Sequence, residues 1–238
     1  MSLGEIISDA IKYPFSDITG FIMAGILVLL AAIPNVVYPT PEGRGLIYLL
    51  LALIGFIFAI VLSGYSIGVI KNAIQHSSEI PGIDPVANFI DGIKVIIIGI
   101  VYFIIPLIIA ALFGGLTSIV GAGLNHAGAG LGIGAIVSLI VFVIFSIFEI
   151  VALSRFADTD EMSAAFNFGA VIEDAKRIGF LNIILFTIVA LILVFIASLI
   201  VSILGIIPFI GPIVAVILLG GFFILFYYRG IGLLYASA

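Results

Sequence analysis

Four long stretches without a charged residue dominate the pattern of this sequence. They lie between Asp17 and Glu42, Arg44 and Lys71, Lys94 and Glu149, and Arg177 and Arg229. A helix needs about 20 apolar residues to cross the hydrocarbon core of a membrane, so each of the first two stretches has room for one crossing. Each of the last two has room for a pair, which glycine and proline residues near 121–134 and 205–212 divide. The pattern predicts six spans, near residues 18–38, 46–70, 95–120, 134–154, 181–206 and 212–229.

Basic residues are distributed unevenly between the two faces that these spans define. Both ends of the chain fall on one face, which carries seven of the eight Lys and Arg residues; the other carries Arg44 alone. Positively charged loops are retained on the cytoplasmic side of a membrane. We therefore expect a multi-pass protein of the cell membrane with cytoplasmic N- and C-termini.

A short polar motif occurs directly before the first, third and fifth predicted spans. Each copy has an acid, a small residue, any residue and a base, and the copies run from Asp9 to Lys12, Asp91 to Lys94 and Asp174 to Arg177. The acids are 82 residues (91 − 9) and 83 residues (174 − 91) apart. Each copy lies in a stretch with helical periodicity, which predicts three amphipathic helices on the inner membrane surface.

The sequence thus predicts an all-α protein, a six-span helical bundle with a pseudo-threefold repeat. Residues 1–238 form one integral membrane domain, with repeat units near 1–83, 84–166 and 167–238. Each unit is a surface helix followed by a transmembrane hairpin. The acid and base of each motif have the spacing of a solvated salt bridge on a helix, and a functional ring of charges is the alternative.

Composition excludes several classes of protein. Hydrophobic residues make up 64% of the chain and charged residues 9%, against about 45–50% and about 25% in soluble domains. A soluble globule is therefore excluded, and the net charge of −5 argues against a nucleic-acid binder, which needs a basic surface. There is no cysteine, and His76 and His126 fall on opposite sides of the predicted topology. We expect neither a metal nor a cofactor.

Several motifs resemble those of a known family. They are Gly64-Tyr65 leading into residues 69–71, Glu79-Ile80-Pro81, the run at 89–94 and the run at 164–169. This pattern, with Tyr13-Pro14-Phe15, resembles a family of polytopic membrane proteins known as domain of unknown function 4013, common in methanogenic and halophilic archaea. The likeness covers nearly the whole chain. Its motifs are structural, and the resemblance implies no catalytic residue.

Glu149 is the one ionisable residue inside a predicted apolar stretch, six residues before Arg155. A charge among lipid-facing helices is unfavourable unless it is paired, protonated or hydrated, so an intramembrane acid is a candidate functional residue. A structural ion pair with Arg229 or Lys71 is one interpretation. A role in binding a solute, a proton or an ion is the other.

Gly64 and Gly68 form a Gly-x-x-x-Gly motif in the second predicted span. Small residues at this spacing typically allow two helices to pack closely. A glycine-lined pathway is the alternative.

Three classes of function remain open. The first is a non-catalytic scaffold or lipid-organising protein, whose partners are membrane lipid and either other membrane proteins or further copies of the chain. The second is a small-solute or ion transporter with Glu149 in its pathway. The third, an intramembrane enzyme, has little support because no catalytic constellation is found; we therefore expect no enzyme activity.

The predicted topology can be tested by labelling single cysteines, because the natural chain contains none. We expect Gly43→Cys and Ser77→Cys to react with an impermeant maleimide from opposite sides of the membrane. Reaction of both residues from the same side would contradict the predicted topology.

Overall fold

The computed structural model describes residues 1–38, 45–112, 133–207 and 210–238, and it is helical with no strand in these ranges. Six helical segments are long and apolar enough to cross a membrane, which confirms the predicted all-α architecture with six spans. They are α2 (Ile18–Val37), α3 (Leu46–Ile74), α4 (Pro85–Leu112), α6 (Ile133–Thr159), α9 (Phe180–Leu204) and the segment Ile210–Ala236.

The sixth span consists of three parts in series. It begins as α10 (Ile210–Ala215), continues through the π-helical segment η2 (Val216–Gly220) and ends as α11 (Gly221–Ala236). Helix α2 crosses it closely at this point, because a Cβ atom built on Gly25 would overlap the backbone carbonyl of Ile217. The π-helical segment, whose turn is wider than that of an α-helix, therefore lies where two helices cross closely.

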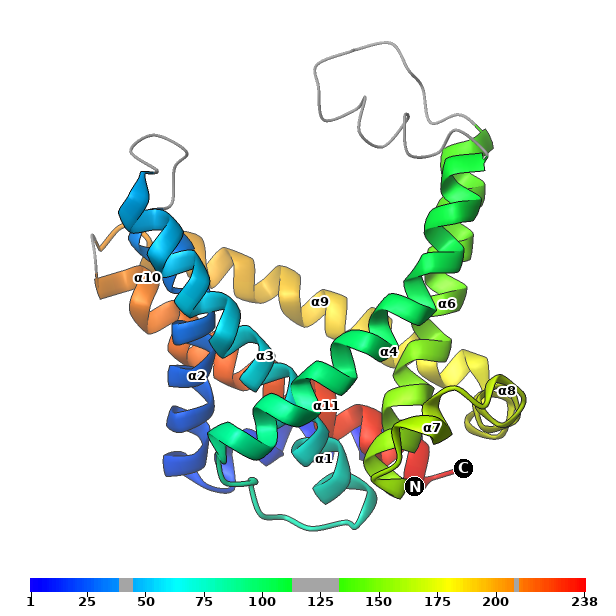
Figure 1. The fold of residues 1–238 in the computed structure, drawn as a ribbon. Coiled ribbons are helices and arrows are strands. Elements are labelled where there is room, and N and C mark those ends of the chain that lie inside the picture. The colour runs from blue at the N-terminus through cyan, green and yellow to red at the C-terminus, as the bar shows by residue number, and fades with distance from the viewer. Residues whose placement is uncertain (39–44, 113–132, 208–209) are drawn as a thin grey trace.

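Both termini and three of the short helices gather at one end of the molecule (Figure 1). These helices are α1 (Leu3–Lys12), α7 (Met162–Ala165) and α8 (Phe168–Ile178). We call this the charged end, since Asp9, Lys71, Arg155, Asp174 and Arg229 lie there. Toward the opposite end, α2 and α3 lean to one side and α4 and α6 to the other, while α9 runs obliquely between the two groups (Figure 1).

The most tightly packed part of the bundle is near the charged end. Its main cluster of buried side chains joins residues of α1, α3, α4, α6, α8, α9 and α11, with Phe156, Phe186 and Phe226 at most 2% exposed. The far halves of α4 and α6 carry exposed apolar side chains, such as Ile108 and Leu139. Lipid is as apolar as these side chains, so their exposure carries no hydrophobic penalty inside a membrane.

Two of the three helices predicted before the spans are separate elements. Helix α1 begins with a capping box in which the Ser2 backbone N–H donates to Glu5 Oε2 (2.7 Å), and Ile6 and Ala10 form its buried side. It ends at a 3₁₀ turn (Tyr13–Phe15). Helix α8 is preceded by the N-cap residue Asn167, whose Oδ1 accepts from the Ala170 backbone N–H (3.2 Å), and it is followed by Gly179 with φ of +87°.

The prediction of a separate surface helix before the third span is wrong. Residues 85–94 are the first turns of the continuous helix α4. The difference lies in the residues that follow each motif. Pro14 and the cap residue Asp17 interrupt the chain after α1, and the positive φ of Gly179 interrupts it after α8. No proline and no positive φ directly follows Lys94, and Pro106 lies 12 residues later (106 − 94) inside α4, so the helix continues past the motif.

Helices α3 and α4 cross at two glycines. A Cβ atom on Gly64 would overlap the backbone carbonyl of Asn88, and one on Gly92 would overlap that of Ile60. Gly68 is in a different environment, because its Cβ atom would lie 3.5 Å from Pro81 Cβ, an ordinary contact distance. Of the two glycines in the motif, Gly64 alone lies where the two backbones approach most closely.

This difference predicts opposite outcomes for two alanine substitutions in α3. Gly64→Ala should lower the free energy of unfolding by about 1–3 kcal/mol, because the backbones must move apart. Gly68→Ala should change it by less than about 0.5 kcal/mol. Unfolding of the detergent-solubilised protein by SDS measures both values, and equal losses would contradict the close crossing at Gly64.

Candidate functional site

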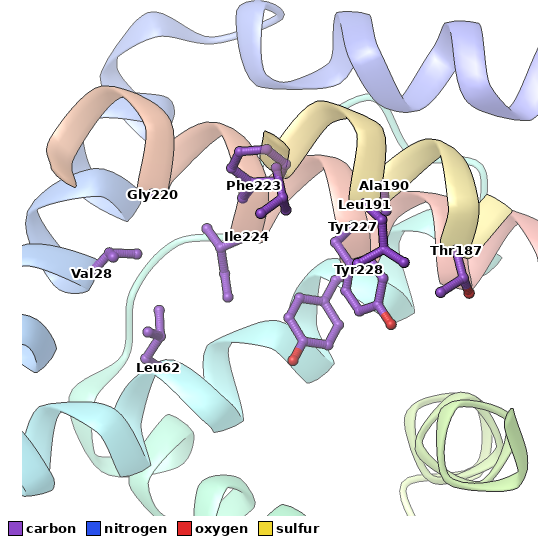
Figure 2. Close-up of a pocket in the computed structure, with 11 residues that line it drawn as sticks. Val28, Leu62, Thr187, Ala190, Leu191, Gly220, Phe223, Ile224, Tyr227 and Tyr228 are labelled. Atoms are coloured by element: carbon purple, nitrogen blue, oxygen red, sulfur yellow. The ribbon is translucent and has the colours of Figure 1, made fainter. Parts of the chain in front are cut away.

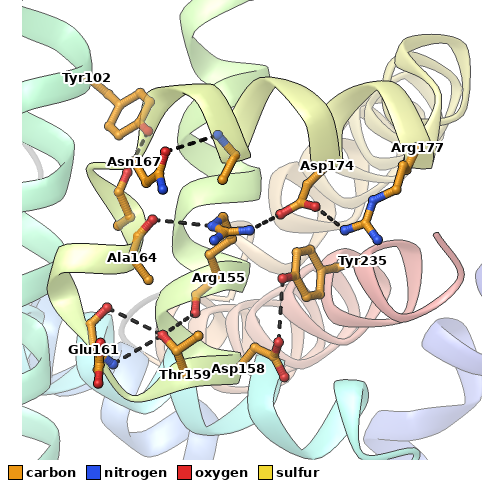
Figure 3. A network of polar contacts seen from close by, with 12 residues as sticks. Tyr102, Arg155, Asp158, Thr159, Glu161, Ala164, Asn167, Asp174, Arg177 and Tyr235 are labelled. Atoms are coloured by element: carbon orange, nitrogen blue, oxygen red, sulfur yellow. Dashed lines mark hydrogen bonds and ion pairs between the residues drawn. The ribbon is translucent and has the colours of Figure 1, made fainter.

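Asp174 of α8 is the centre of an ionic network at the charged end (Figure 3). Asp174 is 3% exposed, and its two carboxylate oxygens pair with Arg155 of α6 and Arg177 of α8. Arg155 also donates from Nε to the backbone carbonyl of Ala164 (3.3 Å). A buried carboxylate is tolerated only with such partners, so Asp174 holds α8 against the end of α6.

Neighbouring side chains connect this network to further helices (Figure 3). The Tyr102 hydroxyl of α4 donates to the Ala165 carbonyl (2.7 Å), and the Tyr235 hydroxyl of α11 donates to Asp158 Oδ2 (3.5 Å). The Lys94 ammonium lies 5.3 Å from the ring centroid of Phe156. The network therefore links α4, α6, α8 and α11.

Arg229 of α11 forms a second buried ionic contact. It is 4% exposed, donates from Nε to Asp9 Oδ1 of α1 (2.8 Å) and donates to the backbone carbonyl of Ser77. Its guanidinium carbon lies 4.5 Å from the ring centroid of Tyr13. Burial raises the pKa of Tyr13 to about 12, so its hydroxyl stays protonated and donates to the Glu79 carbonyl (2.7 Å) at neutral pH.

These contacts correct the predicted pair between Glu149 and Arg229. Arg229 pairs with Asp9, and Lys71 pairs with Asp160 (2.5 Å). The physical reason is the direction in which α11 presents Arg229, toward α1 and the segment after α3, whereas the Glu149 carboxylate faces α4.

The three repeated motifs differ in their ion pairs. Asp91 pairs with Lys94 (2.7 Å), and Asp174 pairs with Arg177, as expected from their spacing. In the first motif, Asp9 pairs with Arg229, and Lys12 makes no ion pair with a residue that the structure describes.

Glu149 lies on α6 between α4 and α11. A Cβ atom built on Gly99 of α4 would lie 3.3 Å from Glu149 Oε1, so the glycine leaves room for the carboxylate. Among the described residues, none forms a hydrogen bond or an ion pair with this carboxylate.

Apolar grooves follow α9 on both of its sides, and we call them the α9 grooves. The first has a volume of about 480 Å³ and lies between α9, α11, α2 and α3 (Figure 2). The second, about 440 Å³, shares Val28, Val194, Gly220 and Phe223 with the first and extends toward α10. The third, about 410 Å³, lies between α9 and α6 and shares Thr187, Leu191 and Tyr227 with the first. No charged residue lines any of the three grooves.

The grooves and the link between Asp174 and Arg155 were missed by sequence reasoning. Nearly every position of α9 is apolar, so its sequence does not indicate which side packs against protein. The burial of Asp174 has a weak signal, because it falls among Val171, Ala175 and Ile178 on the apolar side of α8. His126 lies outside the described residues.

Comparisons with known proteins identify the family. Residues 47–206 match the family described as Protein of unknown function (DUF4013). The match covers more than half of the chain, which therefore belongs to this family. No curated protein and no solved structure matches the chain.

The burial of Asp174 predicts a large effect from removing its charge. Asp174→Asn leaves Arg155, whose side chain is 20% exposed, without a counterion, and should lower the free energy of unfolding by about 3 kcal/mol or more. Asp91→Asn is the matched control, because Asp91 and Lys94 are about one-third exposed, and it should cost less than about 1 kcal/mol. SDS unfolding compares the two variants. Similar losses would show that the Asp174 network is not a structural link.

Proposed function

We propose that this member of the DUF4013 family is a non-catalytic membrane protein that organises lipid by holding acyl chains in the α9 grooves. The observation that carries the proposal is the continuity of the first and second grooves. Their lining positions on α9 run from Thr187 to Val201, a rise of roughly 21 Å at 1.5 Å per residue. This length exceeds one leaflet of a hydrocarbon core about 30 Å thick, and it suits an acyl chain.

The dimensions of the grooves suit a single acyl chain, which is narrower than a helix about 10 Å wide with its side chains. The first and second grooves measure about 480 and 440 Å³. The apolar lining also matches the chemistry of an acyl chain, which forms no hydrogen bonds.

We further propose that the three sequence repeats are arranged around an axis along the membrane normal, with the charged end in the cytoplasm. Contacts among α3, α6 and α11, the second spans of the three units, support a common axis. Each second span also contacts the start of another unit: α3 contacts α4, α6 contacts α8, and α11 contacts α1. The cytoplasmic placement rests on the seven basic residues assigned to that face.

Transport of a small solute or ion through the bundle is a second candidate function. The observation in its favour is the Glu149 carboxylate, which has no described ionic partner inside a span. A change of reconstituted flux in Glu149→Gln, with folding preserved, would favour transport over lipid organisation.

A groove-filling substitution tests the lipid proposal. Val194 lines both the first and second grooves and is 49% exposed, whereas Ile192, 53% exposed, is two residues away and points to nearly the opposite side of α9. Val194→Phe should reduce the number of motionally restricted spin-labelled lipids by roughly one per protein, because its ring occupies space for a chain. Ile192→Phe is the control and should leave that number unchanged.

Electron paramagnetic resonance of the protein in liposomes measures the restricted fraction. Equal effects of the two substitutions would show that the lipid contacts are those of any membrane protein surface, and the proposal would fail. A melting temperature close to that of the natural chain confirms that each variant is folded.

A further inference from the structure

Three side chains with a hydroxyl group line the third α9 groove, whose other lining residues are aliphatic. They come from three helices: Ser146 from α6, Thr187 from α9 and Tyr227 from α11. Among the residues that the structure describes, none with a charge lines this groove or the first. A phosphate or carboxylate group would have no counterion in these grooves, so the polar group that they suit is a neutral one.

The three hydroxyls differ in what they can still offer to a ligand. Ser146 donates to the Phe142 carbonyl one turn earlier in α6 (2.7 Å), and Thr187 bonds in the same way within α9 (2.8 Å). Each keeps a lone pair that can accept a hydrogen bond but has no proton left to donate. The Tyr227 hydroxyl forms no hydrogen bond with a residue in the described ranges, and its oxygen is accessible rather than enclosed by protein. Its proton is therefore available.

A group that satisfies these hydroxyls must accept one hydrogen bond and donate another. An alcohol has both capacities, whereas an ester carbonyl or an ether oxygen can only accept. Thr187 and Tyr227 are the pair best placed to share such a group, because both line the first groove as well as the third. Figure 2 shows their hydroxyls pointing in the same general direction, away from Phe223.

The first and third grooves adjoin where these two residues lie. Both grooves are lined by Thr187, Leu191 and Tyr227, and we call these three residues the groove junction. From the junction the first groove continues along α9 as far as Val194. One ligand at the junction can therefore extend an apolar chain into each groove.

The groove junction is close to the charged end. Tyr227 lies two residues before Arg229 in α11, a rise of about 3 Å along the helix axis. The third groove is lined on α6 from Ile150 to Val143, which is about 10 Å in the direction away from the charged end. A lipid with its polar group at the junction thus has its chains directed toward the middle of the membrane.

We infer that the groove junction binds a neutral glycerol lipid with two chains and one free hydroxyl group, as in a diacylglycerol. The lipid hydroxyl accepts a hydrogen bond from Tyr227 and donates one to Thr187. One chain lies in the first groove and the other in the third. This combination of an apolar pocket with a few convergent polar groups is typical of small-molecule sites. The inference rests on the proposed function, since both place acyl chains in the α9 grooves, and it adds the class of lipid.

Native mass spectrometry of the purified full-length chain, titrated with 1,2-dioleoylglycerol, tests this site. The comparison ligand is 1,2-dioleoyloxypropane, in which a hydrogen atom replaces the hydroxyl group. We expect about one dioleoylglycerol per chain, bound about threefold to tenfold more tightly than the comparison ligand, as a hydrogen bond typically contributes. Equal affinity for the two ligands would overturn the inference.

Two further ligands test the charge and the number of chains. Dioleoyl phosphatidic acid should bind more weakly than dioleoylglycerol, because no base lines the groove junction. Oleyl alcohol should also bind more weakly, because its single chain fills one groove. Binding of either ligand as tightly as dioleoylglycerol would contradict the inferred lipid class.

Tyr227→Phe removes the hydroxyl and keeps the ring. It should lower the affinity for dioleoylglycerol by the same factor and leave the affinity for 1,2-dioleoyloxypropane unchanged, which also shows that the variant is folded. Thr187→Val should act in the same direction because it removes the acceptor. Tyr38→Phe is the matched control, since Tyr38 lines none of the three α9 grooves. An equal loss for both ligands in Tyr227→Phe would show that the hydroxyl is not recognised.

The proposed lipid function has a separate readout in the restricted lipid of Val194→Phe and Ile192→Phe. If these two variants differ as expected but dioleoylglycerol binds no better than 1,2-dioleoyloxypropane, only the inferred lipid class is rejected. If the two variants have equal effects on restricted lipid, the proposed function itself is rejected.

Discussion

Each charge that lies among the apolar helices needs a partner, and this requirement determines how the charged end is assembled. Removing an ion from water costs several kcal/mol unless a counterion and hydrogen bonds replace its hydration. Arg229 obtains these partners from Asp9 and the Ser77 carbonyl, which draws α1 and the segment after α3 against α11. Asp174 obtains them from Arg155 and Arg177, which fixes α8 against α6. The short helices are thus held by charge neutralisation as well as by their apolar sides.

The span positions were predictable because charge is excluded from the hydrocarbon core. Long stretches without a charged residue, such as that between Arg44 and Lys71, therefore mark the spans. The start of α8 at Asn167 was also predictable, because a cap is a local signal. The ion pair of Arg229 with Asp9 was not predictable, because it depends on the rotation of α11 about its axis and on which helix packs against it. Glu149 was recognisable as a candidate from its position alone, whereas Gly99, which leaves room for its carboxylate, belongs to another helix.

Lateral packing decides where lipid meets the bundle. Helices α3 and α4 approach at Gly64 and Gly92 until their backbones touch, which leaves no room for a chain between them. Helix α9 makes such a close approach at its last residue, where a Cβ atom built on Gly211 would overlap the Leu204 carbonyl, whereas Leu191 and Val194 remain largely exposed beside the grooves. Helices of similar apolar composition therefore pack without a gap between α3 and α4 but leave an open groove, wide enough for an acyl chain, beside α9.

The π-helical segment Val216–Gly220 has a geometric consequence for the sixth span. A single additional residue in a helical turn rotates everything beyond it by about 100° relative to an uninterrupted α-helix. Pro212 and Ala215 before this segment, and Phe223 after it, all reach the second groove. Phe223 therefore faces a direction about 100° away from the one that an uninterrupted α-helix would give it, and the second groove is lined by both parts of the sixth span.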